Sequence, residues 1–366
     1  MDADTDSAEK WLSDTLPDLL REYDPDNIYN ADETGLYFRA TPDRTHAHAS
    51  EAVSGGKKSK ERITVLACTN MSGTDKKKLF VIGKSKNPRC FKNITSLPVD
   101  YRANKNAWMT SDLFIEWLVE WDRSLQLKKR KILLLVDNCP AHPTPPSLKS
   151  IKLMFLPPNT TSIIQPLDQG IIKCLKQLYR KSLCESILSK LESNPAEKAD
   201  KLARQTTLLD AIINCASAWQ KITSATISNC FRKGGFTVAS DDDVYVEEVP
   251  VIPAPQGYNQ DMFEEFSPQD ENAELTAELQ DADIVAAVRG TNETTPESDN
   301  DDDDDAEAEV CKPSITEALK SCETLMDFFK LNGDLDRYQK IQNLLSDIIS
   351  TRPSKQSRLT NFFVRN

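Results

Sequence analysis

Apolar residues recur at helical spacing in some stretches of the chain and form short continuous runs in others. Residues 9–23 bring Trp11 and four leucines to roughly helical intervals, with Pro17 interrupting or restarting the helix. The stretches that follow are short and rich in β-forming residues, which predicts strands. These predicted strands are residues 27–37, 62–70 and 78–82.

The middle of the chain alternates helix and strand. Residues 111–127 carry a stripe of large apolar side chains at helical spacing, which Thr110 or Ser111 can cap. The apolar run 131–136 ends at Asp137 and is typical of a strand buried on both faces of a sheet. Pro166 suits the first turn of a helix, because its missing N–H would have no partner there. The remaining predicted elements are a strand at 152–156 and helices at 167–191, 206–219 and 224–233.

This order of elements predicts an α/β domain, a mixed sheet flanked by helices, over residues 27–240, after a helical segment at 1–26. Residues 241–310 hold 24 acidic residues and one basic residue, so we expect an acidic disordered linker with too little apolar area to fold. Apolar residues return at intervals of three and four over 311–350 and predict a helical hairpin. A tail, 351–366, completes the chain.

Charge divides the chain in the same places. Residues 27–240 carry a net charge of +15 and residues 241–310 carry −23. The basic part suits a polyanion such as DNA, although its lysines could equally be ordinary solvated surface. No run of 18 apolar residues occurs, so we expect no membrane segment. Nine scattered cysteines, none in a C-x-x-C pair, predict reduced intracellular thiols and argue against a zinc site.

Three aspartates occupy positions where sites are built in α/β proteins. Asp32 lies in the first predicted strand, Asp137 ends a buried strand, and Asp168 lies in the first turn of a helix. Carboxylates that converge repel one another unless a cation neutralises them. Oxygen ligands favour Mg²⁺ or Mn²⁺, and two such ions could activate a nucleophile on a phosphodiester. Taken singly, Asp168 could be a helix cap, and Asp137 and Asp32 could be turn residues.

Several long motifs resemble the catalytic region of pogo/Tigger transposases, whose relatives include the jerky proteins and centromere protein B. The clearest are NADETGLYFRATPDRT (30–45), LLLVDNCPAHP (133–143) and LPPNTTSIIQPLDQGIIK (156–173). The resemblance runs from about Trp11 to Phe236. It implies an RNase H-like fold with a triad of metal-binding aspartates, which fall on Asp32, Asp137 and Asp168.

Neighbouring residues have expected supporting roles. Glu33 is a candidate salt-bridge partner, and Asn138 and His142 could orient Asp137 or touch phosphate, although a core or cap role suits His142 equally. Basic residues at helical spacing after Asp168 could face the DNA backbone, or be a solvated face. These are Lys173, Lys176, Arg180 and Lys181.

Transposases of this group carry helix-turn-helix modules before the catalytic region, whereas here that region begins near Met1. We therefore expect this chain to lack those modules. Two hypotheses follow: a nuclear, metal-dependent DNA endonuclease or strand transferase, or a domesticated protein that binds DNA or chromatin and recruits partners without turnover. The oligomeric state stays open.

The tail ends in KQSRLTNFFVRN and resembles the peptides that dock on the replication sliding clamp, proliferating cell nuclear antigen. One helical turn would place an apolar plug on one side, with a glutamine as polar anchor. The alternative is a tail that packs back on its own hairpin. The residues of the motif are Gln356, Leu359, Phe362 and Phe363.

Overall fold

The computed structural model describes most of residues 4–237 and shorter parts of the remaining chain. The described residues are 4–40, 61–92, 94–145, 147–193, 199–237, 250–255, 260–266, 270, 314–331, 337, 340, 341 and 344. The chain divides into two units, Met1–Thr294 and Thr295–Asn366. The expected clamp motif at 356–363 lies outside the described residues.

A mixed sheet of six strands, in the order β4-β3-β2-β1-β5-β6, organises the first unit. β1 pairs antiparallel with β2 and parallel with β5, β2 pairs antiparallel with β3, and both edge pairs are parallel. The long central strand β1 therefore has an antiparallel neighbour on one side and a parallel neighbour on the other, which is the arrangement of an RNase H-like sheet. The bounds are β1 Ile28–Tyr37, β2 Arg62–Asn70, β3 Phe80–Gly83, β4 Asp100–Ala103, β5 Ile132–Val136 and β6 Ile151–Phe155.

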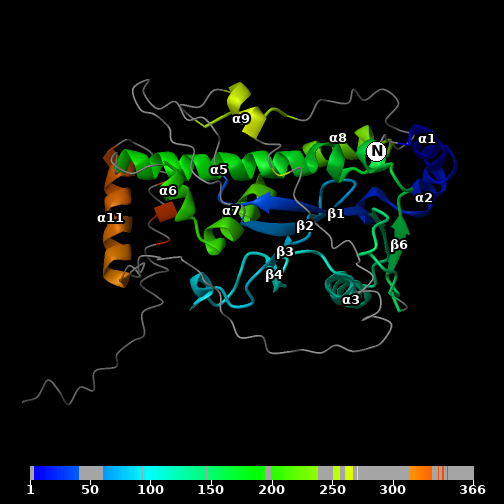
Figure 1. The fold of residues 1–366 in the computed structure, drawn as a ribbon, viewed down its shortest axis with the longest axis horizontal. Coiled ribbons are helices and arrows are strands. Elements are labelled where there is room, and N and C mark those ends of the chain that lie inside the picture. Colours follow the sequence, from blue (N-terminus) through cyan, green and yellow to red (C-terminus); the bar gives the residue numbers. More distant parts are fainter. Residues whose placement is uncertain are drawn as a thin grey trace, which may run out of the picture. The chain divides into compact units, whose positions relative to one another are not determined.

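Helices cover both faces of the sheet (Figure 1). On one face the side chains of Phe114 and Trp117 from α3 pack against alternate residues of the strands, including Tyr29. On the other face, residues of α1, α2, α5, α7 and α8 form the larger apolar cluster. The helices are α1 Thr5–Asp14, α2 Leu16–Glu22, α3 Ser111–Leu127, α4 Thr161–Ile164, α5 Ile172–Ser193, α6 Ala199–Arg204, α7 Leu208–Lys221 and α8 Ser224–Lys233, with short turns η1 Pro25–Asn27, η2 Arg89–Phe91 and η3 Leu167–Ile171.

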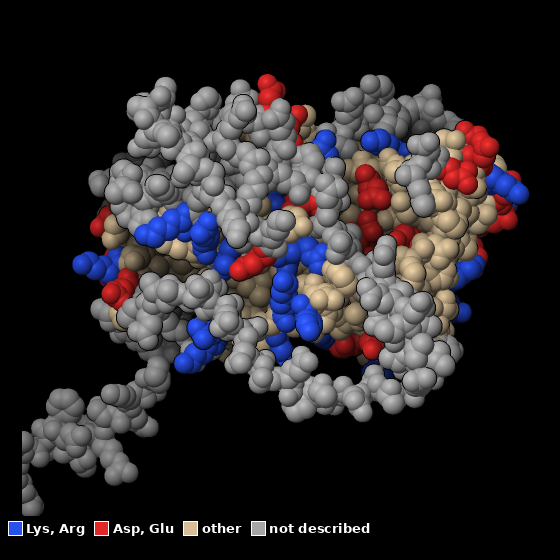
Figure 2. All heavy atoms as spheres, in the orientation of Figure 1, with Lys and Arg blue, Asp and Glu red and all other residues tan. Residues whose placement is uncertain are grey.

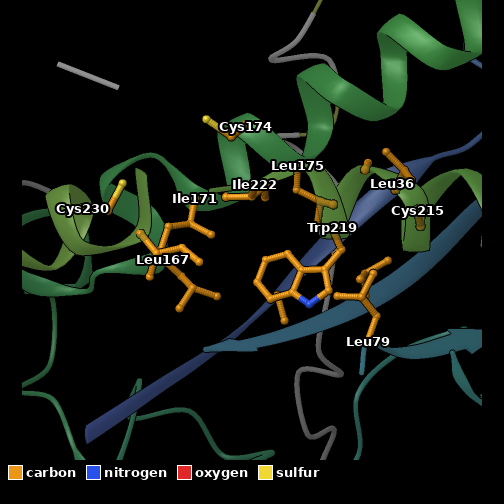
Figure 3. Packing of buried hydrophobic residues seen from close by; sticks show 14 of the residues in the cluster. Leu36, Leu79, Leu167, Ile171, Cys174, Leu175, Cys215, Trp219, Ile222 and Cys230 are labelled. Atoms are coloured by element: carbon orange, nitrogen blue, oxygen red, sulfur yellow. The ribbon is translucent and has the colours of Figure 1, made fainter. Parts of the chain in front are cut away.

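Trp219 of α7 anchors the larger cluster. Its ring lies beside Leu79 and below Leu175 of α5 (Figure 3), and only 2% of the residue is exposed. The indole nitrogen Nε1 donates a hydrogen bond of 2.8 Å to the carbonyl of Lys77, so burial leaves its polar group satisfied. This packing joins α7 and α5 to the sheet, and α5 follows directly from the turn that carries Asp168.

The expected α/β architecture is confirmed, but one element differs at a functional position. Residues 167–191 were expected to form one helix, whereas the structure has the π-type turn η3 before α5 begins at Ile172. Gly170 has a φ of 146°, a backbone conformation open to glycine and costly for other residues. Short π segments are common at functional sites. Asp168 therefore lies in an irregular turn rather than in a regular first helical turn.

Part of the expected acidic linker is ordered. Helix α9, Gln260–Phe266, lies within residues 241–310, and Phe263 and Asp270 are buried. The prediction that 241–310 is disordered throughout is therefore wrong for these residues. In the second unit, α11 Ile315–Leu331 provides the first helix of the expected hairpin. Most of the residues that were expected to form the second helix lie outside the described part of the chain. Among the described helices, none has both the length and the apolarity that a membrane crossing requires.

Candidate active site

Two of the three aspartates are brought together by the pairing of β1 with β5. Asn30 is the partner of Leu135 in this parallel pair, and extending the register by two residues places Asp32 opposite Asp137. Because side chains alternate along a strand, Asp32 shares the face of Asn30, which is the face covered by α5 and η3. Asp137 follows the last residue of β5, where the carboxyl end of a buried strand reaches the surface.

The third aspartate reaches this point from η3. The chain turns at Gln165 and Pro166, and the N–H of Asp168 donates a hydrogen bond of 3.1 Å to the carbonyl of Gln165. The carboxyls of Asp168 and Asp32 lie close enough for each to shift the pKa of the other. Asp168 is exposed, and Asp32 and Asp137 are partly exposed, so the carboxyl cluster is open to solvent. The structure thus brings together all three expected residues.

Crowding of these carboxyls raises their proton affinity. Withdrawal from water raises the pKa of Asp32 well above its usual value, and the charges of Asp168 and Glu33 raise it further. Desolvation and the Asp137 charge also raise the pKa of Asp168, while the side chain of Asp32 opposes this. Each carboxyl therefore makes it harder for its neighbours to lose a proton. A divalent cation would relieve the same repulsion.

A buried imidazole supports Asp137 from the opposite face of the sheet. His142 Nε2 lies 3.0 Å from Glu33 Oε1, and Nδ1 lies 2.6 Å from Asp137 Oδ1. The His142 ring also lies against Phe114, with ring centroids 4.3 Å apart. Burial opposes the charge on His142, but Glu33 and Asp137 raise its pKa to about 12. The structure thus places Glu33 and His142 as a charged pair behind Asp137, while Asn138 is exposed.

One buried amide, missed in the sequence, ties the three carboxyl-bearing segments together. Asn30 Nδ2 donates to the carbonyl of Leu135 at 3.0 Å, and Asn30 Oδ1 accepts from the N–H of Leu167 at 2.9 Å. Asn30 is fully buried. It precedes Asp32 by two residues, Leu135 precedes Asp137 by two, and Leu167 precedes Asp168 by one. A polar residue two positions before an aspartate on a buried strand was the available signal.

The donor set fits a divalent cation. His142 Nδ1 lies 2.6 Å from Asp137 Oδ1, so the imidazole holds this carboxyl in place. Carboxylate oxygens are the usual ligands of Mg²⁺ and Mn²⁺, so a third carboxyl beside Asp32 and Asp168 suits a divalent cation. Asp137, Cys139 and His142 also bring one potential ligand atom each within 4.8 Å of one another. Because both nitrogens of His142 face carboxylates, we assign the imidazole to holding Asp137.

The basic residues after Asp168 divide into two sets. Lys173 is exposed and Lys181 partly exposed, as a contact with DNA requires. Arg180 is fully buried in an ion pair with Asp270, so the prediction that it contacts DNA is wrong. Lys176 is also buried, at 8% exposed, and its charge lowers the pKa of Asp168 instead. Helical spacing cannot show this difference, because packing surrounds α5 on more than one side.

Basic side chains elsewhere remain at the surface. Figure 2 shows Lys and Arg side chains across the middle of one face, with acidic groups close beside them. The loop between β3 and β4 contributes exposed Lys84 and Lys86. Three further lysines occur at residues 57–60, which lie outside the described residues.

Comparison with known proteins assigns the chain to a family. Residues 60–231 match the model of the DDE superfamily endonuclease. The chain is 34% identical over 362 residues to Tigger transposable element-derived protein 4 of Mus musculus, covering 93% of this chain and 69% of that protein. It is 40% identical over 227 residues to Tigger transposable element-derived protein 7 of Homo sapiens, covering 56% and 41%. The human Jerky protein homolog is 34% identical, with 62% of this chain and 41% of that protein covered.

Among solved structures, the catalytic domain of Mos1 mariner transposase overlaps with a TM-score of 0.30 and 14% identity, covering 65% of this chain and 98% of that one. The fold assignment rests on the strand order and register of this chain. The match to the mouse Tigger protein covers most of this chain. By contrast, this chain spans less than half the length of each of the two human relatives. The chain therefore belongs to the pogo/Tigger family of transposable element-derived DDE transposases.

Proposed function

We propose that the first unit of this chain cleaves phosphodiester bonds of DNA with the help of Mg²⁺ or Mn²⁺ held by Asp32, Asp137 and Asp168. The observation that carries the proposal is the convergence of these carboxyls at one end of the β1–β5 pair. The third carboxyl is held in place, because His142 Nδ1 lies 2.6 Å from Asp137 Oδ1. Such a cluster is costly as a purely structural feature, because like charges raise one another's pKa.

Each protein group has a definable task. Asp32 and Asp168 together offer carboxyl oxygens on the exposed side, and Asp137 offers the third from the end of β5. His142 and Glu33 hold Asp137 from behind, and the charge of Lys176 offsets part of the negative charge near Asp168. A bound divalent cation, or a pair of them, would supply Lewis acidity toward phosphate and a nucleophile available at neutral pH.

The choice of DNA as substrate has two supports. The matching family model is described as an endonuclease, and two of the relatives reported above are named as transposable element-derived proteins. The basic charge of residues 27–240 would attract a polyanion without sequence preference. We propose a nuclear location on the same grounds.

A plasmid-nicking assay tests the proposal directly. Supercoiled DNA is incubated with the full chain and Mn²⁺ or Mg²⁺, and the wild type is compared with Asp137→Asn. Asp112→Asn, an exposed acidic residue at the start of α3, serves as a charge-matched control. We expect metal-dependent nicking by the wild type and the control, and none by Asp137→Asn.

The alternative function, DNA binding and recruitment without turnover, predicts a different result. A folded wild type that retards DNA in a gel but leaves it supercoiled in both metals would overturn the cleavage proposal. The carboxyl cluster would then be inherited scaffold, and the exposed basic surface would carry the function.

A further inference from the structure

Gln165 is a buried residue beside the carboxyl cluster to which no role has been given. It is 1% exposed and lies at the end of α4, three residues before Asp168. Its backbone carbonyl accepts the N–H of Asp168 at 3.1 Å, and its own N–H donates to Thr161 at 2.9 Å. The backbone on both sides of the side chain is therefore held in place.

The two ends of the Gln165 amide are in different situations. The side-chain amide lies beside the carboxyl of Asp32 and lowers the pKa of that group. The side-chain oxygen, Oε1, is buried and has no hydrogen-bond partner among the described residues. A buried polar oxygen left unsatisfied is costly, so an unsatisfied amide oxygen in a native structure calls for an explanation.

Gln165 Oε1 borders the carboxyl cluster, because the Gln165 side chain lies beside Asp32 and the Gln165 carbonyl accepts the N–H of Asp168. Oxygen atoms of carboxylates and of Asn or Gln side chains are the usual ligands of hard divalent cations, directly or through bound water. A cation held by the three aspartates would satisfy Gln165 Oε1.

We propose that Gln165 is part of the metal site, holding Asp32 through its amide nitrogen and presenting Oε1 as an uncharged oxygen to the cation's coordination shell. This inference rests on the proposed function, because it requires a divalent cation among the three aspartates. The neutral oxygen adds a donor without adding to the repulsion among the carboxyls. It also links Asp32 and Asp168, since one residue holds the first by its side chain and the second by its backbone.

Gln169 provides a matched control within the same turn. It is also a buried glutamine, at 8% exposed, but its Nε2 donates to the backbone carbonyl of Ser162 at 2.9 Å. Gln165→Leu and Gln169→Leu remove the same amide from neighbouring buried positions. Only the first removes the amide beside Asp32, whose oxygen has no hydrogen-bond partner among the described residues.

The test measures Mn²⁺ binding to the full chain by the loss of the free-ion signal in electron paramagnetic resonance, which does not depend on cleavage. We expect Gln165→Leu to weaken Mn²⁺ binding by about 10–100-fold, the usual effect of losing a group that supports a metal ligand. Gln169→Leu should stay within about twofold of the wild type. Thermal melting in metal-free buffer checks that both variants are folded.

Gln165→Glu separates the two tasks of the amide. A glutamate keeps an oxygen at the Oε1 position but cannot donate to Asp32, so retained or tighter Mn²⁺ binding supports an oxygen that faces the cation. Binding as weak as that of Gln165→Leu would overturn this assignment of the oxygen. Wild-type affinity in Gln165→Leu, with binding lost in Asp137→Asn, would overturn the inference and leave the proposed function intact. A wild type that binds no Mn²⁺ would instead defeat the proposed function.

Discussion

Arg180 of α5 and Asp270 form a fully buried ion pair that attaches the acidic segment to the folded body. The guanidinium Nη2 lies 2.8 Å and 2.7 Å from the two carboxylate oxygens, and both side chains are 0% exposed. Asp270 also accepts the N–H of Tyr37 at 2.8 Å, and Arg180 Nη1 donates to the carbonyls of Tyr37 and Ala40. The pair therefore closes the end of β1 that lies away from its pairing with β5.

Removing one partner should destabilise the first unit strongly. Asp270→Ala leaves an arginine charge buried without its counter-ion, which costs about 3–5 kcal/mol. Asp18→Ala breaks the exposed Arg21–Asp18 pair, whose side chains are 77% and 76% exposed, and should cost about 0–1 kcal/mol. Urea unfolding of both variants measures the difference, and equal midpoints would show that residue 270 does not bind the body in solution.

Sequence reasoning could not find this pair. Asp270 stands in a segment whose composition predicts disorder, and one aspartate among 24 acidic residues carries no mark of burial. The spacing of basic residues along α5 places Arg180 on a stripe that could face DNA. Spacing shows on which face of the helix a residue lies, but not what packs against that face. Contacts between residues 90 positions apart depend on the tertiary fold.

The carboxyl cluster was predictable for a physical reason that the structure makes plain. Asp137 follows a continuous apolar run, and β5 is buried at every position, so the site lies where a predictable strand ends. The geometry around Asp168 was harder to predict from the sequence. The apolar periodicity suggests a continuous helix through residue 170, whereas the φ of Gly170 interrupts that helix. The amides of Asn30 and Gln165 were missed because their roles are hydrogen bonds to other segments, which leave no periodic signal.

Because His142 holds Asp137, removing the charge that positions His142 should lower activity as well as stability. Glu33→Gln keeps the shape of the side chain but removes the charge that holds His142. We expect metal-dependent nicking to fall by about 10–100-fold as Asp137 loses its fixed orientation. Glu116→Gln, which weakens the partly exposed ion pair between Arg102 of β4 and Glu116 of α3, is the control and should leave the rate unchanged. Equal rates in both variants would place Glu33 and His142 among purely structural residues.

Replacing Asn30 should change the Mn²⁺ requirement of the site in addition to lowering stability. Asn30→Leu removes the hydrogen bonds that join β1 to Leu135 and Leu167 and should cost about 1–3 kcal/mol of stability. Thr64→Val is a matched control, because its buried hydroxyl donates to Ala107 at 2.6 Å, far along β2 from the cluster. Both variants should melt earlier than the wild type. Only Asn30→Leu should need more Mn²⁺ for half-maximal nicking, and a similar shift in Thr64→Val would show that general loosening explains it.

The resemblance of residues 356–363 to clamp-docking peptides predicts that the full chain binds the sliding clamp. Phe362 and Phe363 would enter an apolar pocket of the sliding clamp, and two buried aromatic rings would dominate the affinity, since such anchors commonly cost about 2–4 kcal/mol each on truncation. The double variant Phe362→Ala, Phe363→Ala in the full chain should therefore abolish binding to immobilised clamp. Asn361→Ala, the residue beside the first ring and outside the motif, should bind as the wild type does. Clamp binding that survives loss of both rings would place the contact elsewhere in the chain. Absence of binding by the wild type would leave the rings to pack against the chain itself, and the double variant should then melt earlier.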